Sequence, residues 1–556
     1  MSANHLIASV ILLAALSCRA ERLFVGILEA DSIRSIHYST AAFGRVADLP
    51  LVQEQVRTRL DQALLLPAHT GIAVAAPLRI VQSVDPDTPP APDNPASVAI
   101  IPLADDGTLI RQAFTAAYTQ HKTQGAFTLY EAPPDTNRAP RVAVAIADRY
   151  LFTSVSLPAL TWIWENRSKF LEAPPQSLPG TFRILVNPQR IADLTGARSA
   201  QAADTVNLDQ LLRECESLSF SLTLEGAALG LTLRATAKQG SELDTLLASW
   251  RVPSEPLWHA VPDNAFFMSL GAIDRPSLWT PFLGKQRHRL YAPTAGRLAP
   301  QAVAGDRLDY IVPTRNGKGL CWVQLLPLKN QEAARSAIRS LADTDSTTNS
   351  VAFKHLRQRE SGGTTIETYT VILQQPAPPT QARGATAPTT ASPAISHILL
   401  SLLLKHAVLE CAVHNGYCVV ALGPEGAIDE QLPPATFTKR PLPLNRRIGG
   451  QDPALTSDLT FGGLLRAAEL IRHTVTIMPE VKPEQARLLP RGGDGALFGV
   501  IRNDRTLTAS LRVQANEIAA LQRLNREGRA VLQEVFFQIF AAQMMESKKA
   551  PETSDK

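Results

Sequence analysis

Hydrophobic and polar positions alternate along some stretches of the chain and recur at helical spacing along others. Leu229, Leu231 and Leu233 alternate with small or polar residues, which predicts a half-buried strand. Between residues 48 and 64, apolar residues recur every four positions behind an early proline, which predicts an amphipathic helix. A similar helix is predicted after Asp105, with Ile110 and Phe114 on its apolar face. The pattern therefore predicts sheets covered by amphipathic helices.

Tight turns between apolar alternations predict hairpins, of which the clearest has Asn415-Gly416 at its turn. In that register Cys411 faces Val420, and Cys418 faces Val413. The two sulfurs would be diagonal neighbours with backbones about 7 Å apart, which is beyond comfortable disulfide geometry. We therefore expect buried thiols.

Segments of the first half match segments of the second half in the same order, which indicates an internal repeat. The matched pairs are 23–31 with 266–274, 96–103 with 321–328, 144–153 with 411–420, and 220–246 with 498–524. The last pair has an offset of 278 residues, which is held throughout its length.

The repeat and the mixed periodicity together predict the α+β class. We expect two tandem related units, each a mostly antiparallel or mixed sheet with amphipathic helices. Their expected bounds are 21–252 and 253–547, with a hinge at 251–256. Residues 374–393, rich in Pro, Ala and Thr, are predicted to form a disordered loop, and 548–556 a polar tail.

An apolar run at residues 6–16, followed by Ser-Cys-Arg-Ala, predicts a signal peptide over residues 1–20. The run is too short for a stable transmembrane helix. Two processing routes fit: cleavage after Ala20, or lipidation of Cys18, because residues 15–18 resemble a bacterial lipoprotein signal. We expect an exported protein of the periplasm or cell envelope, with a lipid anchor on the second route.

The order of a strand, a capped helix, a hairpin carrying Tyr150 or Tyr417, and a helix near Pro158 or Pro424 supports one resemblance. The chain resembles large duplicated secreted proteins of unknown function from planctomycete-type and verrucomicrobial bacteria. This resemblance covers most of the chain and implies export and a bacterial origin. It supplies no catalytic residue.

The charge composition indicates which kinds of partner are not expected. With 55 Lys and Arg against 51 Asp and Glu, the formal net charge is only +4 over 556 residues. That charge lacks the concentrated basic stripe that neutralises phosphates, so nucleic acid is not expected as a partner. The basic cluster at 285–289 is short, and we interpret it as a solvated face.

No catalytic, cofactor or metal site is predicted. The glycine-rich stretches at 317–319 and 491–495 lack the spacing of a phosphate loop, and no Gly-x-Ser-x-Gly elbow is present. His406, Cys411, His414 and Cys418 are close in sequence. On a hairpin, however, His414 projects opposite the two thiols, so these residues cannot share one tetrahedral ion.

The C-terminal segment carries a wide apolar helical face, which is a candidate partner surface. Its residues are Val531, Val535, Phe536, Phe537, Ile539, Phe540 and Met544. Its polar side lacks the lysines and arginines of a membrane-surface helix. Docking into the protein's own core, binding of a protein, and binding of a membrane or apolar ligand remain open.

We therefore expect a non-enzymatic binding or scaffold protein of the bacterial cell envelope, whose partner is a protein or an envelope polymer. Two alternatives stay open. The first is a carrier of an acyl or lipid-like ligand, and the second is an envelope hydrolase without a recognisable motif. The sequence leaves the oligomeric state open.

Overall fold

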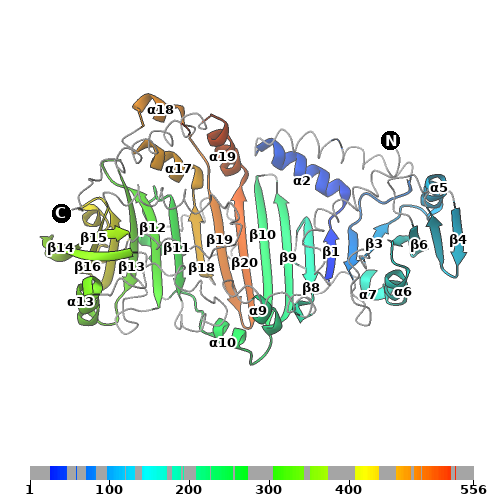
Figure 1. Cartoon of the computed structure of the whole chain (residues 1–556), viewed down its shortest axis with the longest axis horizontal. Coiled ribbons are helices and arrows are strands. Elements are labelled where there is room, and N and C mark those ends of the chain that lie inside the picture. The colour runs from blue at the N-terminus through cyan, green and yellow to red at the C-terminus, as the bar shows by residue number, and fades with distance from the viewer. Residues whose placement is uncertain are drawn as a thin grey trace, which may run out of the picture. The chain divides into compact units, whose positions relative to one another are not determined.

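The structure is a computed structural model of the chain (Figure 1). The residues that it describes are 26–46, 58, 70–82, 97–118, 120–131, 141–171, 178, 180–189, 192, 208–225, 227–253, 257–272, 305–317, 319–343, 351–373, 407–437, 459–477, 481–489, 491–527 and 533. Several predicted features lie outside these residues: the signal peptide with Cys18, the loop 374–393, and the C-terminal partner face from Val531 to Met544.

The chain divides into two compact units. The first comprises Met1–Ala248, Pro281–Lys285 and Arg502–Ala519, and the second comprises Ser249–Thr280, Gln286–Ile501 and Ala520–Lys556. The first unit therefore includes a late segment of the chain, which returns to it after the second unit.

Antiparallel strands make up most of the first unit. They are β1 (Gly26–Ala30), β2 (Leu78–Gln82), β3 (Ser97–Pro102), β4 (Gln120–Gln124), β5 (Phe127–Glu131), β6 (Arg141–Ala147), β7 (Tyr150–Ser154), β8 (Phe182–Val186), β9 (Cys215–Glu225), β10 (Ala228–Ala237) and β20 (Thr506–Gln514). Neighbouring strands pair in the order β4–β5–β6–β7–β3–β2–β1–β8–β9–β10–β20.

The first unit's helices are α2 (Ile33–Val46), α5 (Thr108–Ala117), α6 (Leu157–Glu165), α7 (Arg167–Leu171), α9 (Leu208–Glu214), α10 (Glu242–Ala248) and the first part of α19 (Ala515–Glu527). Phe114 of α5 packs with Ile101 of β3, whereas Leu160 of α6 packs with Ile100. Because successive strand residues face opposite sides, α5 and α6 cover opposite faces of this part of the sheet. Ser156 caps α6 by accepting a hydrogen bond from the Ala159 amide at 3.3 Å.

The second unit contains β11 (Phe267–Ala272), β12 (Asp306–Pro313), β13 (Leu320–Pro327), β14 (Val351–Ser361), β15 (Thr364–Leu373), β16 (Val408–His414), β17 (Tyr417–Gly423), β18 (Leu459–Leu465) and most of β19 (Ala496–Asn503). These strands pair in the order β14–β15–β16–β17–β13–β12–β11–β18–β19. This is the order of the first unit, with each strand number raised by ten. β14 therefore corresponds to β4, and β19 corresponds to β9.

The second unit's helical elements are η2 (Leu257–Ala260), α13 (Gln331–Arg339), η5 (Ser340–Asp343), η7 (Ala427–Glu430), α17 (Ala467–Thr476) and α18 (Pro483–Leu488). Ile338 of α13 packs with Cys411 and Cys418 on one face of the strands. Ile428 of η7 packs with Val419 on the other face. Strands in this unit are therefore buried on both sides, as the apolar runs of β16 and β17 require.

The pairing of β10 with β20 has a local two-fold relation. Thr232 lies opposite Ser510, and these residues are 278 positions apart, which is the offset of the matched segments 220–246 and 498–524. Arg234 and Arg512 differ by the same offset and lie on either side of the Thr232–Ser510 pair. Each strand therefore presents equivalent residues to the other, as in a symmetric interface.

The predicted α+β class with two tandem units is wrong. In the described residues, hydrogen bonds join the strands into one antiparallel sheet of 20 strands, and helices are few by comparison. The units are not consecutive either, because β20 pairs with β10 of the first unit. No local pattern in the sequence marks a pairing between strands so far apart along the chain.

Local turn predictions are confirmed. In the hairpin of β16 and β17, Cys411 faces Val420 and Cys418 faces Val413, around a turn in which Asn415 and Gly416 have positive φ of 44° and 82°. Both residue types tolerate this left-handed backbone conformation. The predicted helix near Pro424 is instead the short element η7, which begins at Ala427.

Candidate functional site

The described cysteines are buried free thiols, which confirms the prediction made for Cys411 and Cys418. Burial raises the pKa of Cys215 to about 11, and it raises the pKa values of Cys321 and Cys418 to about 12. Burial also holds the pKa of Cys411 well above its usual range. Since the thiolate is the nucleophile, none of these four groups is activated at neutral pH.

Metal-ligating side chains do not converge within the residues that the structure describes: no group of three or more His, Cys, Asp or Glu residues could hold an ion there. His414 points away from the thiols, and its Nδ1 lies 2.7 Å from the hydroxyl of Thr364. His406 lies outside the described residues.

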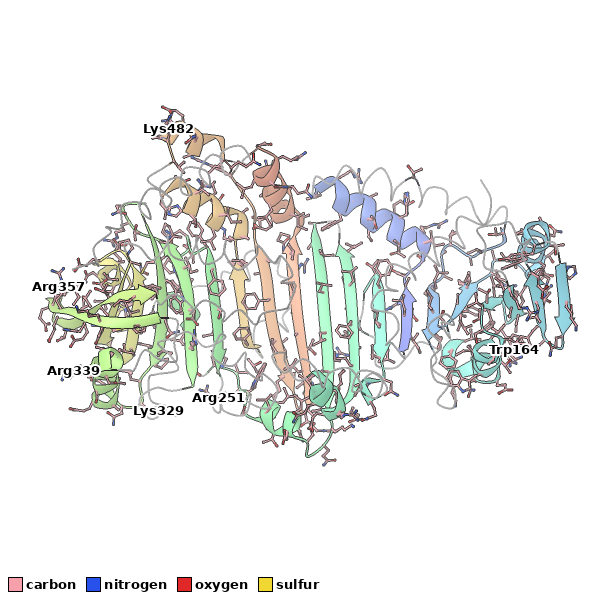
Figure 2. The ribbon with its side chains drawn as sticks, in the orientation of Figure 1. Trp164, Arg251, Lys329, Arg339, Arg357 and Lys482 are labelled. Carbon is pink, nitrogen blue, oxygen red and sulfur yellow. The ribbon has the colours of Figure 1, made fainter. Side chains whose placement is uncertain are left out.

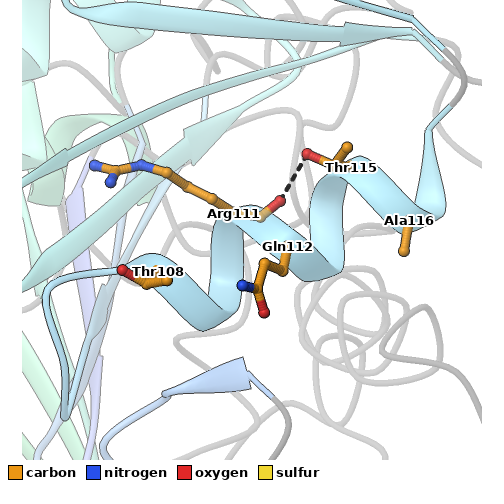
Figure 3. Close-up of a pocket in the computed structure, with 5 residues that line it drawn as sticks. All are labelled: Thr108, Arg111, Gln112, Thr115 and Ala116. Atoms are coloured by element: carbon orange, nitrogen blue, oxygen red, sulfur yellow. Dashed lines mark hydrogen bonds between the residues drawn. The ribbon is translucent and has the colours of Figure 1, made fainter.

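One open depression of about 510 Å³ lies along α5 (Figure 3). It is lined by Thr108, Arg111, Gln112, Thr115 and Ala116, all from this one helix. The Thr115 hydroxyl donates to the Arg111 carbonyl at 2.9 Å, within the helix itself. With Arg111 as the one titratable side chain in the lining, this surface offers no acid–base pair and no nucleophile.

Buried carboxylates of the second unit have matched donors. Glu410 accepts hydrogen bonds from the amides of Gly426 and Ile428 and from Arg359, whose Nη2 is 2.8 Å away. The Asp309 carboxylate accepts two hydrogen bonds from Arg307, from Nε at 2.6 Å and from Nη2 at 3.0 Å. Arg359 also pairs with Asp429, so the Glu410 group holds η7 in place, whereas Arg307 and Asp309 lie two residues apart on β12. Both groups have the character of structural ion pairs.

The neighbouring strands β8, β9, β10 and β20 of the first unit form the candidate site, and Figure 1 shows them side by side. Their residues alternate between two chemically different faces. We name one the leucine face, made up of Phe182, Ile184, Phe220, Leu222, Leu224, Leu229, Leu231, Leu233, Leu511 and Val513. The other is the hydroxyl face, made up of Arg183, Ser219, Ser221, Thr223, Thr232, Arg234, Thr508, Ser510 and Arg512.

The leucine face is apolar across all four strands and is partly exposed. Leu231 lies opposite both Leu222 and Leu511, and Phe182 continues the row beyond Leu222. The side chain of Leu231 is 44% exposed, and that of Ile184 is 36% exposed. Such a contiguous apolar surface is more than a scatter of single exposed residues.

Two helices already occupy one end of the leucine face. Phe43 of α2 and Ile518 of α19 belong to one cluster with Leu224 and Leu229. Ala515, the first residue of α19, is fully buried there. The leucine face therefore binds apolar sides of helices at this end, while Leu231 remains exposed beyond them.

At the β8 side, the hydroxyl face continues into a row of buried charged residues. Glu29 on β1 lies opposite Arg79 on β2 and Arg183 on β8. Arg79 Nε is 2.7 Å from Glu29 Oε2, and Arg183 pairs with the other carboxylate oxygen. The row continues through Ser221 and Thr232 on the next two strands. A row of polar side chains thus runs across one face of the sheet, from β2 to β10.

Comparison with known proteins gives no relative: no family model, no curated protein and no solved structure matches the chain. No helix among the described residues is long and apolar enough to cross a membrane.

The alternation of Leu229, Leu231 and Leu233 predicted one half-buried strand, but neither extended face was predicted, although a further signal was present. Residues 217–224 alternate strictly between serine or threonine and leucine or phenylalanine. That pattern predicts a strand with one hydroxylated side and one apolar side. β10 follows β9 directly, but β8 and especially β20 are farther away in sequence, so one strand alone could not show two extended surfaces.

Proposed function

We propose that the chain is a non-enzymatic binding protein whose leucine face holds an amphipathic helix of a partner protein. The observation that carries this proposal is the exposure of Leu231 at the centre of an apolar sheet surface. Apolar area of this kind gains about 25 cal/mol for each Å² removed from water, so it favours binding.

A helix is the occupant that the surroundings support. On the same face, α2 and α19 already pack through Phe43 and Ile518 against Leu224 and Leu229. A second amphipathic helix beside them would extend this contact toward Leu231 and Ile184. Recognition of an amphipathic helix by an apolar surface uses apolar residues at helical spacing.

Export to a bacterial envelope remains part of the proposal. It is supported by the apolar run at residues 6–16 and by the resemblance to duplicated secreted proteins. Cell fractionation tests it directly, because recovery of the chain in the cytoplasm would contradict export.

Site-specific photo-crosslinking tests the binding function. Leu231→p-benzoylphenylalanine would place the probe on the leucine face, and the matched control would replace Leu356 on β14, which is 53% exposed. The full chain is expressed in its native cells, illuminated, and analysed by mass spectrometry. We expect an adduct with one protein from position 231 and none from position 356.

Two other adducts would overturn the proposed occupant. A lipid-sized mass at position 231 would indicate a carrier of apolar ligands. A crosslink from 231 to residues 528–556 of the same chain would show that the protein covers its own leucine face. Equal labelling of one protein from both positions would also contradict specific binding.

A further inference from the structure

The hydroxyl face places two buried serines between two arginines. On β9, Ser221 lies opposite Arg183 of β8, and Ser219 lies opposite Arg234 of β10. Opposite residues of an antiparallel pair have Cβ atoms about 5 Å apart, and diagonal neighbours are about 7–8 Å apart. Arg183 and Arg234 therefore lie on the two strands that flank the serines, on the same face of the sheet.

The serines are buried, although they are polar. Ser219 and Ser221 are each 4% exposed. Within the residues that the structure describes, neither the Ser221 hydroxyl nor the Nε of Arg183 makes a hydrogen bond. Leaving a buried donor unpaired costs about 1–3 kcal/mol, so such groups are normally satisfied by a partner.

Positive charge exceeds negative charge in this cluster. The Glu29 carboxylate is shared by Arg79 and Arg183, which leaves one positive charge over the three groups. Arg234 adds another on the opposite side of the serines. A second negative group would balance this excess and pair with the unsatisfied donors.

The backbone before β8 packs directly against Ser221. A Cβ atom added to Gly180 would lie 2.9 Å from the Cβ atom of Ser221, which is closer than real side chains approach. Glycine at this position therefore allows this close approach, and a side chain there would press on Ser221.

We infer that Arg183, Arg234, Ser219 and Ser221 form a binding site for an oxyanion of the phosphate type. Arginine presents paired N–H donors that match tetrahedral and carboxylate oxygens, and serine hydroxyls add donors at the base of the site. The site lies on the face opposite the leucine face. It therefore adds a second binding activity that does not depend on a helical partner.

Calorimetric titration of the full chain with inorganic phosphate tests this site. Arg183→Gln and Ser221→Ala each remove one donor group, and Gly180→Ala crowds Ser221 without changing the charge. Charge-assisted hydrogen bonds contribute about 1.5–3 kcal/mol, so we expect each donor variant to bind phosphate about tenfold more weakly or worse. The control is Arg357→Gln, at an arginine whose side chain is 55% exposed on β14 (Figure 2).

Each result then decides the inference. Saturable binding by the wild type and by Arg357→Gln, lost in Arg183→Gln and Ser221→Ala, supports it. No saturable binding to the wild type, or unchanged binding in both donor variants, overturns it, as does equal loss in Arg357→Gln. If Arg183→Gln fails to fold, Ser221→Ala decides, because it deletes a single oxygen.

Vesicles distinguish the source of the oxyanion. Co-sedimentation with phosphatidylglycerol vesicles that is lost in Ser221→Ala would assign the site to a lipid headgroup. Binding of inorganic phosphate without vesicle binding would assign it to a soluble phosphate.

Discussion

The two units pair their strands in the same order, but they differ in how their buried charged residues are paired. In the first unit, Glu29 on β1 lies between Arg79 and Arg183, and positive charge is in excess. In the second unit, the corresponding strands β11 and β12 place Ala272 opposite Asp306. Asp306 is 1% exposed and pairs at 2.6 Å with Arg251, the residue labelled in Figure 2.

This difference indicates that a strand framework does not determine the chemistry on its faces. In the second unit, the buried Asp309 pairs with Arg307, and the buried Glu410 shares Arg359 with Asp429. Positive charge is not in excess in these two groups, which suits a structural role. The first unit instead concentrates two arginines around one carboxylate and extends the row to serines, which suits a ligand site.

The largest expected effect is that of Glu29→Gln, which removes the carboxylate shared by two arginines. Breaking a buried ion pair by deleting one partner costs about 3–5 kcal/mol, because a charge is left buried without compensation. Asp306→Asn should cost less, about 1–2 kcal/mol, since Arg251 is 31% exposed and can turn toward water. Urea unfolding monitored by circular dichroism measures both. Equal losses would contradict the contrast between the units.

A disulfide between Thr232→Cys and Ser510→Cys tests whether β20 completes the first unit. These residues are directly opposite, so their Cα atoms are within bonding range. The oxidised variant should migrate faster on a non-reducing gel and gain about 2–4 kcal/mol of unfolding free energy. As a control, Thr232→Cys with Thr506→Cys places the thiols about four residues apart along the strands. Equal crosslinking of both pairs would argue against the observed register.

A smaller, pH-dependent effect is expected in the second unit at His473. Burial lowers its pKa, and this outweighs the opposite effect of the Gly319 carbonyl, which lies 3.3 Å from Nε2. The unfolded state therefore binds the proton more readily, so stability present above about pH 6.5 is lost as the pH falls. His473→Gln should flatten this decline in urea unfolding between pH 7 and pH 5.5. An unchanged slope would show that another group is responsible.

The smallest effect on folding is expected from Leu231→Ser. Exposed side chains usually change stability by no more than about 0.5 kcal/mol, so this variant and Leu356→Ser should unfold like the wild type. Only Leu231→Ser should weaken partner binding. A loss above 2 kcal/mol in Leu231→Ser would mean that the leucine is covered in the native protein, which contradicts an open face.

The features predicted correctly from the sequence are those that depend on residues close together along the chain. The Asn415-Gly416 turn, the buried Cys411 and Cys418, and the apolar side of α5 at Ile110 and Phe114 all follow from short-range patterns. The fold class and the candidate site depend on distant pairings instead. The repeat makes Thr232 and Ser510 equivalent positions but does not mark them as neighbours, and nothing near Glu29 marks its two arginines. These features therefore needed the three-dimensional structure.

Hydrogen–deuterium exchange of the full chain, with and without inorganic phosphate, compares the two units in one experiment. Phosphate should slow exchange in peptides covering β8, β9 and β10, and leave β11, β12 and β13 unchanged, because the excess positive charge is in the first unit. Uniform exchange with and without phosphate, or protection confined to the second unit, would contradict a site built by Arg183, Ser219, Ser221 and Arg234.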